Sequence, residues 1–280
     1  MDLKKLKMTP PWEWPEETDK ALLEVLNNNR ADPADRVLAA ELVGDFVVIN
    51  DELAGALLSI LQTGSEPEEL RAAAAISLGP VLEHACIEEF DAPDDVPISE
   101  SVFHKIQESL QSLYMDPDVP ENVRRRFMEA SVRAPQPWHQ NAIRSAYAGD
   151  NEDWKLTAVF SMRWVEGFDD QILESLKSNN ENIQYEAVCA AGNWEVDAAW
   201  SHVAGLVKVK GTDKLLLLAA IDAVTAIRPH EARTVLMGLT SLEDEDIVEA
   251  TYEAMAMAEV FSGDEFDDED DDGGGDGFIH

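Results

Sequence analysis

Acidic residues near the end of the chain have a spacing that could hold a calcium ion. Counted from Asp268, positions 1, 3 and 5 of a twelve-residue calcium-binding loop are Asp268, Asp270 and Asp272, and the sixth position is Gly273. Position 12, where such a loop needs a bidentate glutamate, is Ile279, and no exit helix is expected. We therefore predict only weak divalent-cation binding by this aspartate run, and no specific metal site in the chain.

Two other groups of ligand-type residues have spacings that argue against chemistry. His84, Cys86 and Glu88 lie two residues apart, and on a helix such residues point away from one another. His230 and Glu231 lie at an expected helix start, where the helix dipole favours a glutamate. The sequence contains no G-x-S-x-G, Walker, H-E-x-x-H or C-x-x-C motif. We therefore predict no catalytic residue, no cofactor and no enzymatic activity.

Tryptophan is more informative about binding. The chain has seven, and five fall between residues 138 and 200, namely Trp138, Trp154, Trp164, Trp194 and Trp200. Because tryptophan is enriched at binding hot spots, these five are candidate partner-binding residues. The alternative is that the rings wedge between successive helix pairs, and the exposure of each indole distinguishes the two.

The acidic tail ends on apolar residues that form a second candidate binding element. Asp and Gly dominate residues 263–280, a composition typical of a disordered tether. A tether that serves only solubility gains nothing from Phe278 and Ile279, which are followed by His280. We expect these three residues to anchor in a groove on this chain, on a second copy or on a partner.

The charge of the chain limits its partners. It has 57 acidic and 21 basic residues, for a formal net charge of −36, and only nine of the acids lie in the tail. Nucleic acids and anionic membranes bind clustered Lys and Arg, so neither is expected as a partner. A second protein with a basic patch is predicted instead, and the oligomeric state is left open. Two distant cysteines and the lack of a signal sequence or membrane span predict a soluble cytoplasmic protein.

An internal repeat of small residues indicates how these side chains are positioned. Seven amphipathic stretches end 29 to 35 residues apart, except for one interval of 54. They are RVLAAELVG (36–44), RAAAAISLG (71–79), RRFMEASVR (125–133), KLTAVFSMR (155–163), QYEAVCAAG (184–192), LLLAAIDAV (216–224) and IVEATYEAM (247–255). In six of the seven, the residue five before the end is alanine, which lets a neighbouring helix approach closely. Second amphipathic segments follow, for example 50–63, 99–114, 169–179, 197–208 and 230–242, so each repeat is predicted to be a helix pair.

The repeats resemble a known family. DPADRVLAAELVG and EPEELRAAAAISLG match the short HEAT-like repeats found in phycobilisome lyases, and NENIQYEAVCAAGNW matches them in part. A helix pair of this size cannot bury its apolar face alone. We therefore predict an all-α fold, a right-handed α-solenoid of about seven HEAT-like helix pairs. It would span residues 17–262, with a Pro- and Trp-rich cap at 1–16, an insertion loop at about 87–98 and the acidic tail at 263–280.

A polar register recurs eight residues before the end of each stretch. It reads Arg36, Arg71, Arg125, Lys155 and Gln184, and then becomes Leu216 and Ile247. The resemblance implies that these polar side chains pair with an aspartate or a carbonyl of the adjoining helix pair. The alternative is a basic ladder exposed along one edge.

The resemblance implies an adaptor or scaffold, because this family contains few enzymes. Similarity to the HEAT-like deoxyhypusine hydroxylases would require several His-Glu pairs at the repeat spacing to bind two irons, and the chain has one such pair. We therefore expect a non-enzymatic interaction scaffold whose elongated acidic surface selects a basic partner. The alternative is a lyase-like or chaperone-like factor that acts on a bound small molecule such as a bilin.

Overall fold

The fold is built entirely of helices in the part of the chain that the structure describes. The structure, a computed structural model, describes residues 1–90, 95–209 and 211–263, and this part contains no β-strand. The predicted all-α fold is therefore confirmed. The chain divides into two compact units, Met1–Val165 and Glu166–His280.

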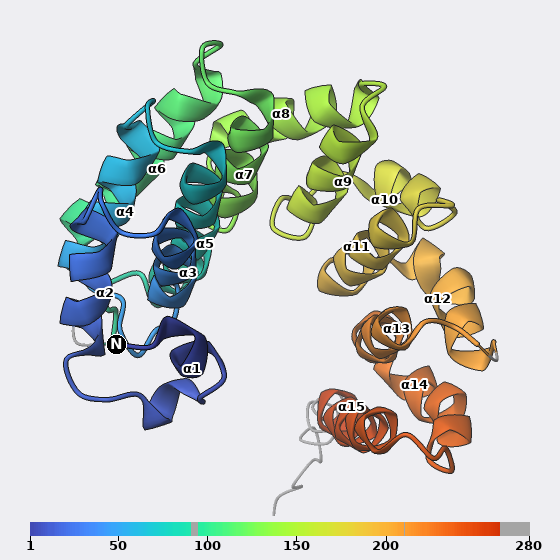
Figure 1. The fold of residues 1–280 in the computed structure, drawn as a ribbon. Helices are drawn as coiled ribbons and strands as arrows, with labels where there is room; N and C mark the ends of the chain where they lie inside the picture. The colour runs from blue at the N-terminus through green and yellow to red at the C-terminus, as the bar shows by residue number, and fades with distance from the viewer. Residues whose placement is uncertain (91–94, 210, 264–280) are drawn as a thin grey trace, which may run out of the picture. The chain divides into compact units, whose positions relative to one another are not determined.

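Unit 1 begins with a short helix, α1 (Leu3–Lys7), and a 3-10 turn, η1 (Pro11–Glu13), and continues as two rows of helices (Figure 1). One row consists of α2 (Thr18–Asn27), α4 (Asp51–Gln62), α6 (Glu100–Met115) and α8 (Pro137–Ala148). The other consists of α3 (Pro33–Val43), α5 (Glu68–Glu88), α7 (Glu121–Ser131) and α9 (Glu152–Ser161). Each helix of the first row packs on the helix that follows it in sequence, and successive helices of the second row pack on one another.

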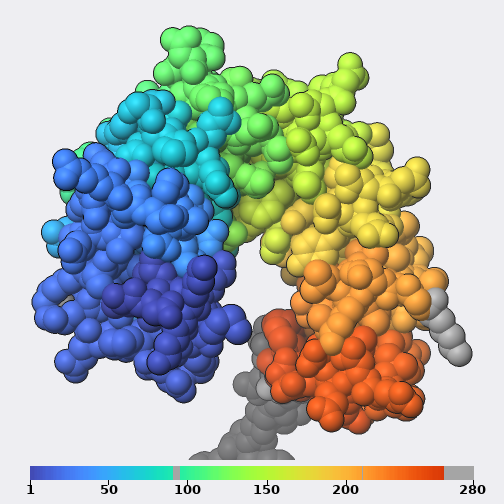
Figure 2. Space-filling model, in the orientation of Figure 1, coloured from blue at the N-terminus to red at the C-terminus, as the bar shows by residue number. Residues whose placement is uncertain are grey.

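Unit 2 repeats this arrangement. One row contains α10 (Asp169–Ser175), α12 (Trp200–Lys208) and α14 (Pro229–Leu236), and the other contains α11 (Glu181–Asn193), α13 (Lys214–Ile227) and α15 (Glu245–Gly263). Two 3-10 turns are also present: η2 (Asp197–Ala199) directly precedes α12, and η3 (Met237–Leu239) directly follows α14. Figure 2 shows the helix pairs packed closely within each unit on the face that it presents. Both units are thus solenoids of helix pairs, while the number of repeats and their handedness stay predictions.

Small residues at the predicted register set the spacing between helices. Ala39, Ala74, Ala158 and Ala187 have no exposed surface, and Met128 is equally buried at the same position of α7. At the end of the fifth stretch, a Cβ atom on Gly192 would lie 3.0 Å from the Cα of Ala223 on α13. The small-residue pattern therefore does what the sequence predicted, which is to let consecutive helices of one row pack closely.

Side chains at three positions of the polar register hydrogen-bond to carbonyl groups at the ends of the preceding helices. The Arg36 guanidinium donates to the Leu26 carbonyl at 3.0 Å, and Arg71 Nε donates to the Leu61 carbonyl at 3.1 Å. In unit 2 the Gln184 amide donates to the Leu176 carbonyl at 3.0 Å. The last carbonyls of a helix have no partner within that helix, so these side chains satisfy them. At these three positions the partner is thus a backbone carbonyl, as expected, and it belongs to the helix that precedes the polar side chain in the sequence.

Helix α5 is longer than the aligned stretch within it, which ends at Gly79. The helix continues through Pro80 to Glu88, and burial of Val81 and Leu82 favours the continuation despite the hydrogen bond that proline removes. Among the described helices α5 alone is long and apolar enough to cross a membrane, and 56% of that window is buried inside the protein. This degree of burial shows that much of the helix packs against neighbouring helices of unit 1.

Candidate functional site

The five candidate tryptophans lie in separate places. Trp138 and Trp154 of unit 1 both contact the ring of Tyr114, with centroid distances of 4.9 and 6.2 Å. Both indoles are half-buried, so neither is fully covered by its own helix pairs. The rings of this aromatic cluster therefore pack against one another while part of each indole stays accessible to solvent. Their role in partner binding stays a prediction.

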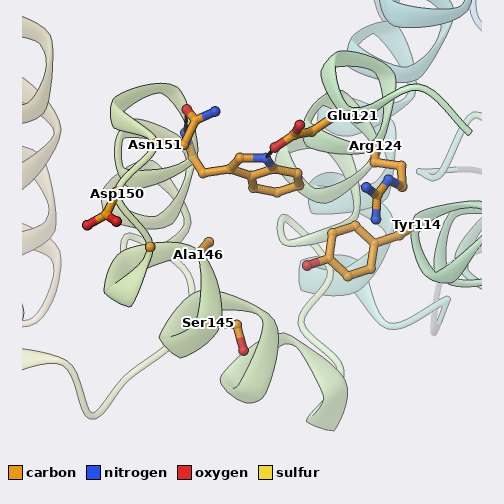
Figure 3. A pocket seen from close by; sticks show the side chains of 9 residues that line it. Tyr114, Glu121, Arg124, Ser145, Ala146, Asp150 and Asn151 are labelled. Atoms are coloured by element: carbon orange, nitrogen blue, oxygen red, sulfur yellow. Dashed lines mark hydrogen bonds between the residues drawn. The ribbon is translucent and has the colours of Figure 1, made fainter. Parts of the chain in front are cut away.

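A pocket of about 340 Å³ opens beside this cluster (Figure 3). Tyr114 comes from the last turn of α6, and Arg124 from the first turns of α7. Ser145 and Ala146 of α8 form another wall, and Trp154 comes from the first turn of α9. The pocket is thus assembled by two consecutive helix pairs, α6–α7 and α8–α9, from residues up to 40 positions apart in the sequence.

Two polar contacts hold Trp154 in this pocket. The Asn151 side chain caps α9 by accepting from the backbone N–H groups of Asp153 and Trp154, at 2.9 and 3.2 Å. The indole Nε1–H of Trp154 donates to the Glu121 carboxylate, a bond drawn as a dashed line in Figure 3. A capped helix start and a carboxylate from the preceding helix pair therefore fix the orientation of the ring.

Of the nine lining residues, the sequence singled out only Trp154, and the ones it missed include two hydrogen-bond donors, Tyr114 and Arg124. Burial raises the pKa of Tyr114, opposed in part by the positive charge of Arg124, so the phenol stays protonated and can donate a hydrogen bond. The Arg124 Nε atom is buried and has no hydrogen-bond partner among the described residues. The run Arg124–Arg126 was the available signal, because only its middle member, Arg125, occupies the repeat register.

Trp164 belongs to a second cluster of unit 1. Its Nε1–H donates to Glu83 at 2.9 Å, and the other oxygen of Glu83 accepts from Arg133 at 2.6 Å. The Arg133 guanidinium also lies 4.9 Å from the centre of the Trp164 ring. These contacts tie the ends of α5 and α7 to the residues that follow α9, which is a packing arrangement.

Trp194 and Trp200 belong to unit 2. Trp194 follows α11 and is 36% exposed, whereas Trp200 begins α12 and is 9% exposed. The Arg228 guanidinium lies 5.3 Å from the centre of the Trp200 ring, and it also pairs with Asp197 at 2.7 Å. The structure therefore leaves Trp194 accessible and places Trp200 in the packing of its own unit.

The other candidate residues fall outside the described part of the chain. They are the possible cation ligands Asp268, Asp270 and Asp272 and the apolar end Phe278, Ile279 and His280. Within the described residues, no three His, Cys, Asp or Glu side chains are grouped so that they could hold a metal ion. The Glu231 carboxylate of the single His-Glu pair accepts from Arg228 at 2.9 Å in the first turn of α14.

His139, next to Trp138, predicts a pH dependence of stability. Its Nδ1 accepts from the Gln136 backbone N–H at 2.9 Å, and burial lowers its pKa from the ordinary value of 6.5 to about 4. The unfolded chain therefore binds a proton that the folded chain does not, so stability is complete above pH 6.5 and falls as the pH drops toward 4. Between pH 7.5 and pH 5 we expect this group to remove about 2 kcal/mol from the free energy of unfolding.

Urea denaturation of the natural chain and of the His139→Gln variant at both pH values checks this prediction. The variant is expected to be less stable at pH 7.5, because the ring and its contacts are lost, but to lose less stability on acidification. All other titrating groups are common to both chains, so the difference between them isolates His139. If both chains lost the same free energy on going to pH 5, the assignment to His139 would be wrong.

Comparison with models of known families and with curated proteins finds no match. Among solved structures, human deoxyhypusine hydroxylase matches with 15% identity and a TM-score of 0.42, over 92% of this chain and 88% of that one. The Escherichia coli protein YibA matches with 17% identity and a TM-score of 0.45, over 88% and 84%. An engineered protein matches with 17% identity and a TM-score of 0.37, over 86% and 96%. All three TM-scores lie below 0.5, so the helical repeat fold rests on the packing of this chain's own helices.

One of these comparisons corrects the prediction that the chain is not an enzyme. Deoxyhypusine hydroxylase is an enzyme with a HEAT-like fold, so helical repeats of this kind do not exclude catalysis. At 15% identity the likeness transfers neither an activity nor a residue to this chain. These comparisons do not favour the alternative of a factor that acts on a bound small molecule such as a bilin.

Proposed function

We propose that this chain is a protein–protein interaction scaffold whose acidic surface selects a partner with a basic patch. The proposal includes a cytoplasmic location, repeats of the phycobilisome-lyase type, and a partner that is neither nucleic acid nor membrane. It also includes residues 1–16 as a cap and 263–280 as a tail. Helical repeats offer extended surfaces for such contacts, and charge complementarity selects among partners.

The observation that supports this proposal is that several basic side chains are buried or paired within the fold. Arg36, Arg71 and Arg125 are each less than a tenth exposed. Lys214 pairs with Asp244 at 2.8 Å and with a second aspartate, so its charge is neutralised within unit 2. Packing thus removes three of the 21 basic side chains from the surface, and ion pairing neutralises a fourth.

The acidic side chains are distributed differently. Among the acidic residues that the structure describes, Glu129 alone is buried, and it accepts from the hydroxyl of Thr157 at 2.6 Å and from Arg126. The other described carboxylates keep contact with solvent. With a net charge of −36, this distribution leaves a surface field that attracts cationic partners and repels anionic ones.

A pair of matched peptides tests the proposal. Both carry the same apolar residues, one with lysines and the other with glutamates between them, and binding to the full chain is followed by fluorescence anisotropy. The lysine peptide is expected to bind and to lose about tenfold or more in affinity between 50 and 300 mM NaCl, because salt screens exposed charges. The glutamate peptide is expected not to bind. The proposed selection would be contradicted if both peptides bound with equal affinity, or if the affinity of the lysine peptide were the same at 50 and 300 mM NaCl.

A further inference from the structure

We propose that the pocket between α6–α7 and α8–α9 binds a carboxylate attached to an aromatic or branched apolar group. Such a site goes beyond the proposed selection of basic partners, because it recognises the opposite charge. It is a ligand site in one unit, formed by Arg124 and Tyr114 as donors and by the rings of Tyr114 and Trp154 as walls. The same chemistry could be supplied by a small organic acid or by an acidic peptide.

Arg124 is the first observation that points to an anion. The Arg124 Nε atom is buried and has no hydrogen-bond partner, and no ion pair joins its guanidinium to a described residue. Burying a charged donor without an acceptor is unfavourable, so neighbouring residues or a ligand normally supply one. A carboxylate matches the fork of a guanidinium with two parallel hydrogen bonds.

The other polar groups of the pocket agree with this assignment. Figure 3 shows the Arg124 guanidinium next to the ring of Tyr114, whose hydroxyl is the second available donor. Of the two lining carboxylates, Glu121 accepts from the Trp154 indole, and Asp150 points away from Arg124 and Tyr114 (Figure 3). The free hydrogen-bonding capacity of the pocket is therefore mainly that of donors, which suits an acceptor such as a carboxylate.

The local charge differs from that of the whole chain. Residues 114–154, which include every lining residue, contain five basic and seven acidic residues, whereas the full sequence has 21 and 57. The segment that forms the pocket is thus much closer to neutral than the whole chain, so the net charge of the protein does not by itself exclude an anion there. Arginine, tyrosine and tryptophan are also the residue types that dominate binding hot spots.

The walls define the remainder of the ligand. The rings of Tyr114 and Trp154 are 6.2 Å apart at their centroids and nearly perpendicular, with an interplanar angle of 76°. A planar ligand group in this corner can place its face against one of these rings and its edge against the other, and aromatic groups prefer such contacts. The apolar group of the ligand is therefore expected to occupy this corner while its carboxylate reaches Arg124.

Isothermal titration calorimetry with two pairs of probes tests the site. The first pair is 3-phenylpropionate and its neutral amide. The second is the peptide of residues 275–280, blocked at both ends so that Asp276 carries its only carboxylate, and the same peptide with Asp276→Asn. We expect one or both acids to bind with a dissociation constant of about 1 mM or tighter, and the matched neutral probes to bind at least about tenfold more weakly. Binding of the small acid alone identifies an organic acid as the source, and tighter binding of the peptide identifies an acidic peptide.

Two variants distinguish recognition from charge and from folding. Arg124→Met is expected to weaken acid binding at least tenfold, and Lys105→Met, the same charge change at an exposed position of α6, is expected to leave it unchanged. Because Arg124 has no partner to lose, its methionine variant should unfold at the same urea concentration as the natural chain or at a higher one. The inference is overturned if neither acid binds, if the neutral probes bind as well as the acids, or if Arg124→Met binds the acids normally.

Discussion

Replacing Arg36 with methionine is expected to lower the free energy of unfolding by about 3 kcal/mol, because it breaks a buried ion pair. The Arg36 guanidinium holds both oxygens of Glu66, at 2.7 and 2.8 Å, and the Leu26 carbonyl. The two side chains are only 8% and 15% exposed, and hydrogen bonding to Arg36 lowers the pKa of Glu66. The variant would leave a largely buried carboxylate and a helix-end carbonyl without their donor.

The matched control is Lys20→Met, which removes an exposed ion pair with Glu17. This pair joins side chains that are 69% and 72% exposed, so its loss is expected to change stability by less than about 0.5 kcal/mol. Urea denaturation followed by circular dichroism gives both values. A loss in Arg36→Met no greater than that in Lys20→Met would show that the polar register does not stabilise the repeats.

Replacing Gly192 with valine is expected to lower the free energy of unfolding by about 3 kcal/mol through overpacking. Even the Cβ atom would lie 3.0 Å from the Cα and 3.1 Å from the Cβ of Ala223, so the backbones of α11 and α13 must separate. Gly205 of α12 is a suitable control, because a Cβ there would meet nothing within 4 Å. Gly205→Ala is expected to stabilise the chain by up to about 1 kcal/mol, because alanine favours a helix.

The measurement is thermal or urea unfolding of the two glycine variants beside the natural chain. We expect Gly192→Val to lower the free energy of unfolding and Gly205→Ala to raise it, since helix packing requires a glycine at the first position but not at the second. If Gly192→Val unfolded at the same urea concentration as the natural chain, the close approach of α11 and α13 would not be a constraint on this sequence.

Local sequence signals were sufficient to predict most helices. Asn50, Asn151 and Asp213 cap α4, α9 and α13 by accepting backbone N–H groups, and side chains of this type mark helix starts in any sequence. Helix α8 was not identified, although it carries the buried residues Ala142 and Ile143. Its start lies within a proline-rich stretch, APQP, that is typical of a loop, and the proline at its first position was a start signal that went unused.

The candidate site could be predicted only in part. Residue type alone singled out Trp138 and Trp154, because large aromatic side chains are informative wherever they occur. Tyr114 and Arg124 became informative only through packing, which brings the last turn of α6 beside α7 and α9. Spacing along one chain does not encode such long-range contacts, and an arginine without a partner is recognised only when its surroundings are known.

The central claim is that the folded body, and not the acidic tail alone, selects a cationic partner. The most direct test is the affinity of the lysine peptide for a chain that ends at Ser262, compared with the full chain at equal salt. The shorter chain lacks the nine acidic residues of the tail but keeps the exposed carboxylates of both units. Our account predicts that it still binds, with an affinity that falls as NaCl is raised and with preference over the glutamate peptide. Complete loss of binding on removal of residues 263–280 would contradict the account and assign recognition to the tail.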